Sequence, residues 1–265
     1  MDKYILITNA NSNLGNEIVK KLIAENYIVF AGDASYENKE FGNLIYLNLD
    51  PKNKQSLSLA KKYIQRFTSK INAIIHLGFY VSYASLVECE AEELEKSFEK
   101  NFFSAFKINQ EFWDLVELRT GKIIHNCSDV SAFELAPFNG VYSLGKSLLN
   151  NYVDILRREL GFRGINVVKI HAGIIKDENF EEIRESYYNA SEASKYFYSE
   201  ISRFIDINID REALVEIDEY ADFVIQIVKQ RRTKPVYYLK VNKQLKKISK
   251  YPKNLVDRAF KNYNK

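Results

Sequence analysis

Cysteine is scarce in this sequence: its 265 residues contain only Cys89 and Cys127. Two distant cysteines provide neither a disulfide framework nor a zinc-binding spacing, so no metal site is expected. Long apolar runs are also missing, because Lys or Glu interrupts each one before it reaches the roughly 18 residues of a membrane span. The N-terminal segment MDKYILITNA is typical of a strand and carries no signal-peptide cleavage pattern. We therefore expect a cytoplasmic protein.

Acidic residues are almost absent from the end of the chain. Residues 229–265 contain 13 Lys and Arg and a single acid, Asp257, whereas the whole chain carries a net charge of only +3. We expect one domain over residues 1–241 and a basic amphipathic tail over 242–265. Such a tail can contact an anionic membrane or an acidic partner, but we favour a solvated face packed against the chain's own acidic body. Nucleic-acid binding is not expected.

The composition, 46% hydrophobic and 28% charged, is that of an ordinary globular protein with room for one sizeable core. Apolar segments of strand length alternate with amphipathic helical segments. The expected strands are 4–7, 28–31, 44–49, 72–78, 121–124, 164–170 and 236–241. This alternation predicts an α/β protein with a doubly wound parallel sheet, right-handed crossovers and three α/β/α layers.

The segment 121–147 combines a buried strand with chemically useful side chains. Its apolar run 123–124 is followed by Ser128, then by a loop, and then by Tyr142 and Lys146. On a helix, residues four apart share one face with about 5–6 Å between their Cβ atoms. An ammonium beside a phenol favours the phenolate, so we expect the pKa of Tyr142 to fall from about 10 towards neutrality and to suit acid–base catalysis. Ser128 could hydrogen-bond the reacting oxygen. With 18 Tyr and 38 Lys and Arg in the chain, such a pair alone carries little weight.

The segment 8–15 joins the first strand to a helical pattern. Strand, tight turn and helix form the geometry that places a pyrophosphate on a helix N-terminus. Asn9 and Asn13 lie in this turn, and we expect both in left-handed conformations, because Asn is the non-glycine residue most tolerant of positive φ. Gly15 is expected to permit close packing of the helix on the strand.

Asp33 ends the second predicted strand, about 20 residues after this turn. A carboxylate there can accept hydrogen bonds from the ribose hydroxyls of a dinucleotide and would repel a 2′-phosphate. Position 12 is Ser, and no Lys or Arg follows Asp33 directly. The sequence therefore favours NAD over NADP.

Together these features resemble the short-chain dehydrogenase/reductase family, with its Ser…Tyr-x-x-x-Lys active site and Rossmann-like fold. The resemblance covers about residues 3–241. It implies that Tyr142 is the general acid/base, that Ser128 polarises the substrate oxygen, and that Lys146 lowers the phenol pKa and holds the nicotinamide ribose. It also implies that the backbone of Asn101 supports a proton relay through water. The implied cofactor-binding residues are Thr8, Asn9, Asn11, Asn13, Leu14, Gly15, Asp33, Asn48, Leu49, Gly78, Tyr142, Lys146, Gly173 and Ile175.

The sequence also departs from the family pattern. Asn9 and Asn13 replace glycines, His76 begins His-Leu-Gly-Phe in place of Asn-Asn-Ala-Gly, and Ala172 replaces a proline. These changes favour a rival reading, a dinucleotide-sensing or scaffold protein with vestigial catalysis. We favour the enzyme, an NAD-dependent oxidoreductase acting on a small-molecule secondary alcohol or carbonyl, because all four catalytic positions are retained. A homodimer or homotetramer is expected.

Two features of the sequence allow two interpretations each. His76 is a lone imidazole at a strand end, and we favour a structural role for it over a catalytic one. Residues 178–206 are rich in aromatics, which suggest either a bulky or apolar ligand or a subunit contact. These aromatics are Tyr187, Tyr188, Tyr196, Phe197 and Tyr198.

Overall fold

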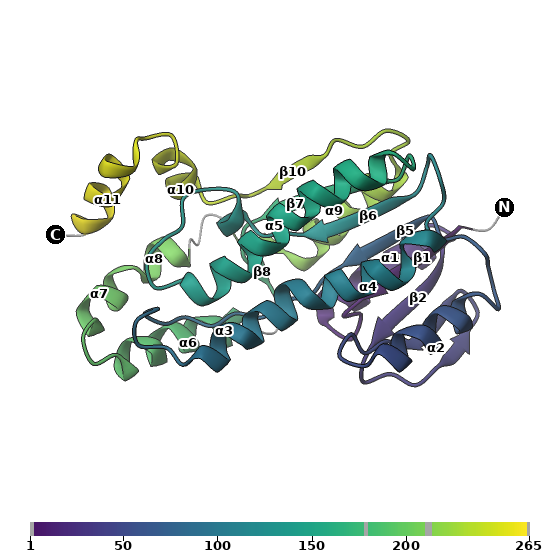
Figure 1. The fold of residues 1–265 in the computed structure, drawn as a ribbon, viewed down its shortest axis with the longest axis horizontal. Coiled ribbons are helices and arrows are strands. Elements are labelled where there is room, and N and C mark those ends of the chain that lie inside the picture. Colours follow the sequence, from purple (N-terminus) through teal and green to yellow (C-terminus); the bar gives the residue numbers. More distant parts are fainter. Residues whose placement is uncertain (1–2, 178–179, 210–213, 264–265) are drawn as a thin grey trace.

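The computed structural model describes residues 3–177, 180–209 and 214–263. Its centre is an eight-stranded sheet with the order β10-β7-β6-β5-β1-β2-β4-β3 (Figure 1). The strands are β1 (Tyr4–Thr8), β2 (Ile28–Asp33), β3 (Lys39–Phe41), β4 (Leu44–Asn48), β5 (Ala73–His76), β6 (Lys122–Asn126), β7 (Asn166–Ala172) and β10 (Val236–Leu239). All pairings are parallel except that of β3 with β4.

Helices cover both faces of the sheet. They are α1 (Asn13–Ala24), α2 (Lys54–Ile64), α3 (Ala91–Phe98), α4 (Ser104–Phe112), α5 (Gly140–Gly161), α6 (Phe180–Ala193), α7 (Tyr198–Arg203), α8 (Ile205–Asn208), α9 (Ile217–Lys229), α10 (Lys243–Ile248) and α11 (Lys253–Lys261). In β1, Ile5 and Ile7 pack with α1 and α9, whereas Leu6 packs with α2, α4 and α5 on the other face. Successive strand residues point to opposite faces, so strands buried on both sides are apolar throughout. The predicted three-layer, doubly wound fold is confirmed.

The edge strand β3 was missed by the sequence reading. Its three residues are all exposed, and it pairs antiparallel with β4 through a two-residue hairpin. Gly42 provides the left-handed conformation of that hairpin, with φ +58°. A fully exposed edge has no apolar periodicity, so nothing in the sequence marks it as a strand. A second, two-stranded sheet pairs β8 (Ile175–Lys176) with β9 (Val215–Glu216) and was not predicted either.

The helical stretch predicted over 88–118 is interrupted by a wider turn. A π-helical segment, Glu99–Phe103, separates α3 from α4, and a short 3₁₀ turn, Trp113–Leu115, follows α4. Single π turns inside α-helices occur frequently at functional sites. Asn101 lies within this one and is buried.

A third apolar cluster lies beyond the sheet. Helices α6, α7, α8, α10 and α11 gather at the end of the molecule opposite α2 (Figure 1). The tail contributes Leu245 to this cluster, where it is only 2% exposed, and Ile248, Phe260 and Tyr263 pack against the cluster. Lys253 of the tail also pairs with Glu134, 2.5 Å away. None of the described helices is long and apolar enough to span a bilayer.

Truncating Leu245 tests whether the tail is part of the folded body. Leu245→Ala should lower the free energy of unfolding by about 2–4 kcal/mol, because it leaves a cavity in a packed cluster. The matched control is Leu255→Ala, since Leu255 is 41% exposed and should lose less than about 0.5 kcal/mol. Urea denaturation measures both. Equal losses would contradict this role, and co-sedimentation with anionic vesicles that requires residues 242–265 would assign the tail to a membrane surface.

Candidate active site

A cavity of about 140 Å³ opens at the carboxyl ends of β1, β5, β6 and β7. Ligands of doubly wound sheets bind at this edge. The lining combines the turn after β1, the loops after β5, β6 and β7, and the helices beyond the sheet. Lining residues from these segments include Asn9, Ser12, Leu14, Phe79, Tyr83, Asn126, Ser128, Asp129, Asn139, Tyr142, Gly173, Ile175, Asp177, Asn208, Asn242 and Leu245.

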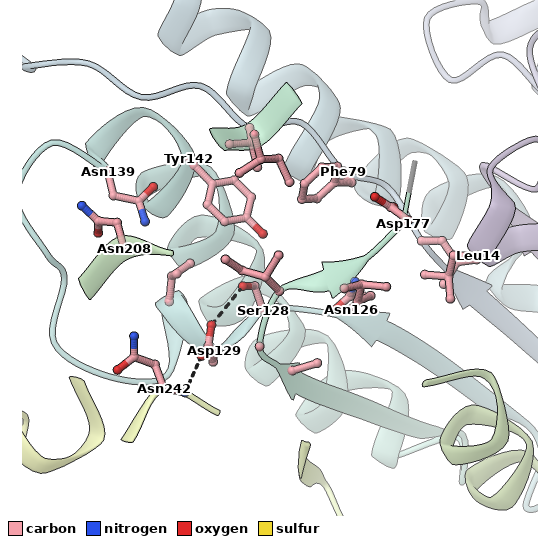
Figure 2. A pocket seen from close by; sticks show the side chains of 18 of the residues that line it. Leu14, Phe79, Asn126, Ser128, Asp129, Asn139, Tyr142, Asp177, Asn208 and Asn242 are labelled. Atoms are coloured by element: carbon pink, nitrogen blue, oxygen red, sulfur yellow. Dashed lines mark hydrogen bonds between the residues drawn. The ribbon is translucent and has the colours of Figure 1, made fainter. Parts of the chain in front are cut away.

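Tyr142 and Ser128 meet in this cavity. Tyr142 lies in the first turn of α5, 7% exposed, with its ring edge-on to Phe79 at 5.8 Å. Its hydroxyl points towards Ser128 (Figure 2). Ser128 follows β6 with φ +60°, an uncommon conformation for a residue with a side chain. Its carbonyl accepts hydrogen bonds from His171 Nδ1 at 2.7 Å and from Ser131 Oγ at 3.0 Å, which hold that conformation.

Lys146 lies one turn further along α5 and is completely buried. Its Nζ donates to the carbonyls of Gly78 at 2.9 Å and Asn126 at 3.1 Å, so it ties together the ends of β5 and β6. Burial lowers the pKa of Lys146 to about 8. The Nζ lies 5.9 Å from the centre of the Tyr142 ring.

The expected fall in the pKa of Tyr142 is wrong, because the pKa is raised. Burial raises that pKa, the side chain of Ser128 lowers it, and the nearby Asp129 carboxylate raises it. The ammonium of Lys146 is engaged with two carbonyls and has a lowered pKa itself. Burial of the phenol therefore raises the pKa of Tyr142 by more than the ammonium of Lys146 lowers it.

The side chain of Asn101 is hydrogen-bonded to the loop after β5. Its Oδ1 accepts from the Tyr80 amide at 3.1 Å and its Nδ2 donates to the Tyr80 carbonyl at 2.8 Å, which fixes the loop after β5. A Cβ on Gly145 would lie 2.7 Å from Ser97 Oγ and 3.2 Å from Asn101 Cβ. Gly145 thus lets α5 approach the π-helical segment closely and places Lys146 beside it.

The turn after β1 follows the prediction in part. Asn9 is left-handed, with φ +57°, as predicted. The prediction for Asn13 is wrong, because Asn13 is the first residue of α1 and is helical. The N-cap is Ser12, whose Oγ accepts from the Gly15 amide at 3.0 Å. A Cβ on Gly15 would lie 2.7 Å from the Ala10 carbonyl oxygen, so the close packing expected at this glycine is present.

Asp33, at the end of β2, and Asn11, in the turn after β1, are not among the residues that line the cavity. Asp33 accepts hydrogen bonds from the amide of Ser35 at 3.0 Å and from its hydroxyl at 2.7 Å. Asn11 Nδ2 donates to the same hydroxyl at 3.0 Å. The turn and the end of β2 are therefore linked through Ser35, and Asp33 is the last residue of β2.

The remaining predicted cofactor residues differ in what they can offer. Asn48 donates its Nδ2 to the carbonyls of Ala34 and Tyr36, and Leu49 is buried in the core with its amide on the Asp33 carbonyl. The side-chain amide of Asn48 is thus already hydrogen-bonded, and the side chain of Leu49 is already packed in the core. Thr8, Gly78, Gly173 and Ile175 all lie at strand ends bordering the cavity, and the last two line it.

Comparison with known proteins decides the family. The family model for short chain dehydrogenase matches residues 3–188 of this chain. The chain belongs to the short-chain dehydrogenase family. Its activity class is that of an NAD(P)-dependent oxidoreductase.

Individual relatives of this short-chain dehydrogenase are distant. The chain is 24% identical over 275 aligned residues to an NADPH-dependent 3-dehydrocapnine reductase of Ornithobacterium rhinotracheale, covering 97% of this chain and 96% of that protein. It is 25% identical to an NADPH-dependent 1-acyldihydroxyacetone phosphate reductase of Schizosaccharomyces pombe, over 83% and 76% of the two chains. A short chain dehydrogenase of Burkholderia cenocepacia, solved in complex with NADP, superposes with a TM-score of 0.72 at 16% identity, over 98% and 97% of the two chains.

Four polar residues of this short-chain dehydrogenase's cavity were missed by the sequence reading. Two of them are close in sequence to predicted residues. Asp129 immediately follows Ser128, and Asn139 lies three positions before Tyr142. Asn208 and Asn242 come from segments distant in sequence, and no local pattern identifies them. Figure 2 shows the side chains of all four around the cavity.

The aromatics of the 178–206 segment do not line the cavity. Tyr187 is buried against the Tyr83 ring, 4.8 Å away, whereas Tyr188, Tyr196 and Tyr198 are more than half exposed. Residues 178 and 179 lie outside the described part of the chain. These aromatics therefore provide no argument for a bulky apolar ligand.

His76 also lies away from the cavity lining. Its ring stacks on that of His125 at 4.4 Å, and its Nε2 bonds Asn109 Oδ1 at 2.8 Å. Asn109 Nδ2 in turn bonds His125 Nε2 at 3.2 Å. This buried polar group between β5, β6 and α4 supports the structural role favoured for His76.

Proposed function

We propose that the protein interconverts a secondary alcohol and a carbonyl compound, with NAD(H) as its cofactor. The observation that carries the proposal is Tyr142, a buried phenol facing Ser128 in a cavity at the carboxyl edge of the sheet. Tyr142 is the proton donor and acceptor, and Ser128 Oγ holds the substrate oxygen. Lys146 fixes the floor of the site through Gly78 and Asn126. Asn101 is proposed to support proton relay.

The protonated form of Tyr142 is the one that carbonyl reduction requires. The phenol is protonated at neutral pH, since its pKa lies above the ordinary value near 10, and a protonated phenol can donate to a carbonyl oxygen as that oxygen gains charge. In the reverse direction the phenol would first have to lose its proton.

The residues present fit a dinucleotide. The N-terminus of α1 opens on the cavity, and its first turn contains no acid that would repel a pyrophosphate. In this proposal Asp33 would hold the adenosine ribose, and Gly173 and Ile175, which line the cavity with Tyr142, would lie beside the nicotinamide. Bound there, the cofactor supplies the hydride chemistry.

Isotope transfer tests the proposed reaction. NADH carrying deuterium at the transferable position, incubated with a panel of ketones, should leave deuterium on the carbinol carbon of the product alcohol. Transfer from neither NADH nor NADPH to any ketone of the panel, by a protein shown to bind cofactor, would overturn the proposal.

Asp33 is expected to make NADH bind at least about tenfold more tightly than NADPH, because its carboxylate accepts from ribose hydroxyls and repels the extra phosphate. The two relatives named above are NADPH-dependent, so this proposal rests on Asp33 itself. Calorimetric titration measures both affinities. Asp33→Asn should reduce the ratio of NADH affinity to NADPH affinity. The control Glu37→Gln changes an exposed acid of the same loop and should leave this ratio unchanged. Tighter NADPH binding by the wild type would reverse the assignment.

Replacing Asn9 by glycine should change cofactor affinity by less than about 1 kcal/mol. Asn9 is already left-handed, and Asn tolerates that conformation better than other side chains. Adding Asn13→Gly should change little more, because Asn13 lies on the exposed first turn of α1. A gain of several kcal/mol in either variant would instead show that asparagine side chains obstruct the phosphate site.

We further propose that the protein is a homodimer or homotetramer. Four apolar side chains of the neighbouring helices α4 and α5 and the π turn between α3 and α4 are at least 36% exposed: Phe103, Phe106, Leu148 and Ile155. Light scattering after size-exclusion chromatography tests this, and a monomer at micromolar concentration would contradict it.

A further inference from the structure

Ser128 has a backbone conformation that its own side chain disfavours. Its φ is +60° and its ψ is +155°, a combination that is essentially confined to glycine. Such a conformation persists only where the surrounding structure holds it. Returning φ to the ordinary negative range would rotate the chain about the N–Cα bond by about 120° and turn the hydroxyl of Ser128 away from its present direction. Ser128 lines the cavity, and the hydroxyl of Tyr142 points towards it (Figure 2). The contacts that hold this backbone therefore also aim the hydroxyl.

Two hydrogen bonds to the Ser128 carbonyl come from different parts of the fold. Ser131 Oγ donates at 3.0 Å, but Ser131 belongs to the same loop and also bonds the Cys127 carbonyl at 2.8 Å. It shapes the turn and does not fix the turn against the sheet. His171 Nδ1 lies 2.7 Å from the same carbonyl, and His171 belongs to β7. An imidazole nitrogen bonded to a carbonyl oxygen carries the hydrogen, so His171 is the donor that ties the loop to the sheet.

The imidazole of His171 is itself held in place. The residue is 2% exposed and lies opposite Tyr238 in the parallel pairing of β7 with β10. The two rings stack with their centroids 5.4 Å apart. The Tyr238 ring also stacks with that of Phe133 at 6.1 Å, and Phe133 belongs to the loop that follows Ser128. A donor whose own orientation is fixed by packing can hold a strained backbone accurately.

We propose, building on the function proposed above, that His171 is a positioning residue for carbonyl reduction. Its ring does not line the cavity and touches no reacting atom. Its hydrogen bond keeps Ser128 in the left-handed conformation, and this conformation keeps the Ser128 hydroxyl where it can donate to a substrate oxygen that also faces Tyr142. Without this bond the backbone relaxes, and the hydroxyl leaves the site although Ser128 is still present.

Two substitutions of His171 separate the hydrogen bond from the ring. The side-chain nitrogen of Asn can take the place of Nδ1, whereas Leu fills similar space and donates nothing. His171→Leu should lower kcat by at least about tenfold, and by no more than the roughly 10²–10³-fold expected of Ser128→Ala. His171→Asn keeps a donor and should stay within about threefold of wild type. Steady-state kinetics with saturating NADH measures kcat on a ketone that the wild type reduces.

A double variant and a matched control show whether His171 acts through Ser128. In the Ser128→Ala background, His171→Leu should lower kcat by less than about a further threefold, because the hydroxyl that His171 positions is already gone. The control His76→Leu removes another buried histidine from a strand end, one that bonds Asn109 and does not line the cavity. Both His→Leu variants should lower the midpoint of urea denaturation, but His76→Leu should keep kcat within about threefold of wild type.

Two measurements need no turnover. In the wild-type protein, ¹⁵N NMR of the histidine rings should show His171 protonated at Nδ1, and protonation at Nε2 alone would overturn the inference even if the variants do not fold. In crystal structures of the variants, Ser128 should leave positive φ in His171→Leu and keep it in His171→Asn.

The outcomes separate this inference from the proposed function. A His171→Leu protein that keeps Ser128 at its wild-type φ, or that is as active as His171→Asn, would overturn the inference. So would a double variant in which the losses of His171→Leu and Ser128→Ala multiply. If the wild type reduces no ketone, the proposed reaction fails, while the NMR spectrum and the crystal structures still decide whether His171 positions Ser128.

Discussion

Replacing Tyr142 by phenylalanine should lower kcat for carbonyl reduction by about 10²–10⁴-fold, the usual effect of losing a general acid or base. The substitution removes one hydroxyl and keeps the ring that packs edge-on against Phe79. Cofactor affinity should therefore remain nearly unchanged. Steady-state kinetics with saturating NADH measures kcat, and calorimetric titration measures the cofactor affinity.

The matched control for this experiment is Tyr152→Phe. Tyr152 lies on the same helix, is largely buried, and bonds Asn109 Nδ2 through its hydroxyl at 3.1 Å, but it does not line the cavity. Its loss should leave kcat within about threefold of wild type, because no reacting atom is touched. A Tyr142→Phe variant as active as this control would remove Tyr142 from the mechanism.

The fold was predictable because its strands are buried on both faces. Ile5, Leu6 and Ile7 pack into two different cores, and such a segment must be apolar throughout. The exposed strand β3 and the short β8–β9 pair lack that constraint, so their sequences resemble loops. The π turn at Asn101 has no sequence signal either, since its neighbours have ordinary helical composition and its contacts with Gly145 and Tyr80 are tertiary.

The candidate site was predictable where it depends on local geometry. The four-residue spacing of Tyr142 and Lys146, and the strand end at Ser128, are local facts. Asn208 and Asn242 reach the cavity only through tertiary packing of the helices beyond the sheet. The pKa of Tyr142 depends on how far the phenol is removed from water, which spacing alone does not reveal. The assumption that Asn13 replaces a left-handed glycine failed because Asn13 is the first residue of α1 and does not belong to the turn.

Acidification from pH 7.5 to 5 should destabilise the protein by several kcal/mol. The chain has three histidines, and burial lowers the pKa of each: that of His76 to about 4, that of His125 well below its ordinary value, and that of His171 below it. The unfolded chain, with histidine pKa values near 6.5, then binds protons that the folded chain does not. Stability is full above about pH 6.5 and falls below it, by about 1.4 kcal/mol per pH unit for each histidine whose pKa in the folded protein lies well below the pH, as for His76 and His125.

The stacked pair His76 and His125 should dominate this loss. Protonating His76 would place a cation against the His125 ring, and Lys146 already disfavours a positive charge on His125. His76→Gln retains an amide donor for Asn109 Oδ1 and cannot titrate, so the slope of stability against pH should flatten by about 1.4 kcal/mol per unit. Tyr152→Phe removes an uncharged partner of the same Asn109 and should keep the wild-type slope. Urea denaturation between pH 5 and 7.5 measures all three proteins in a range above the titration of carboxylates. A wild-type stability that is flat across this range would show that the histidines are already protonated, or solvated, in the folded protein.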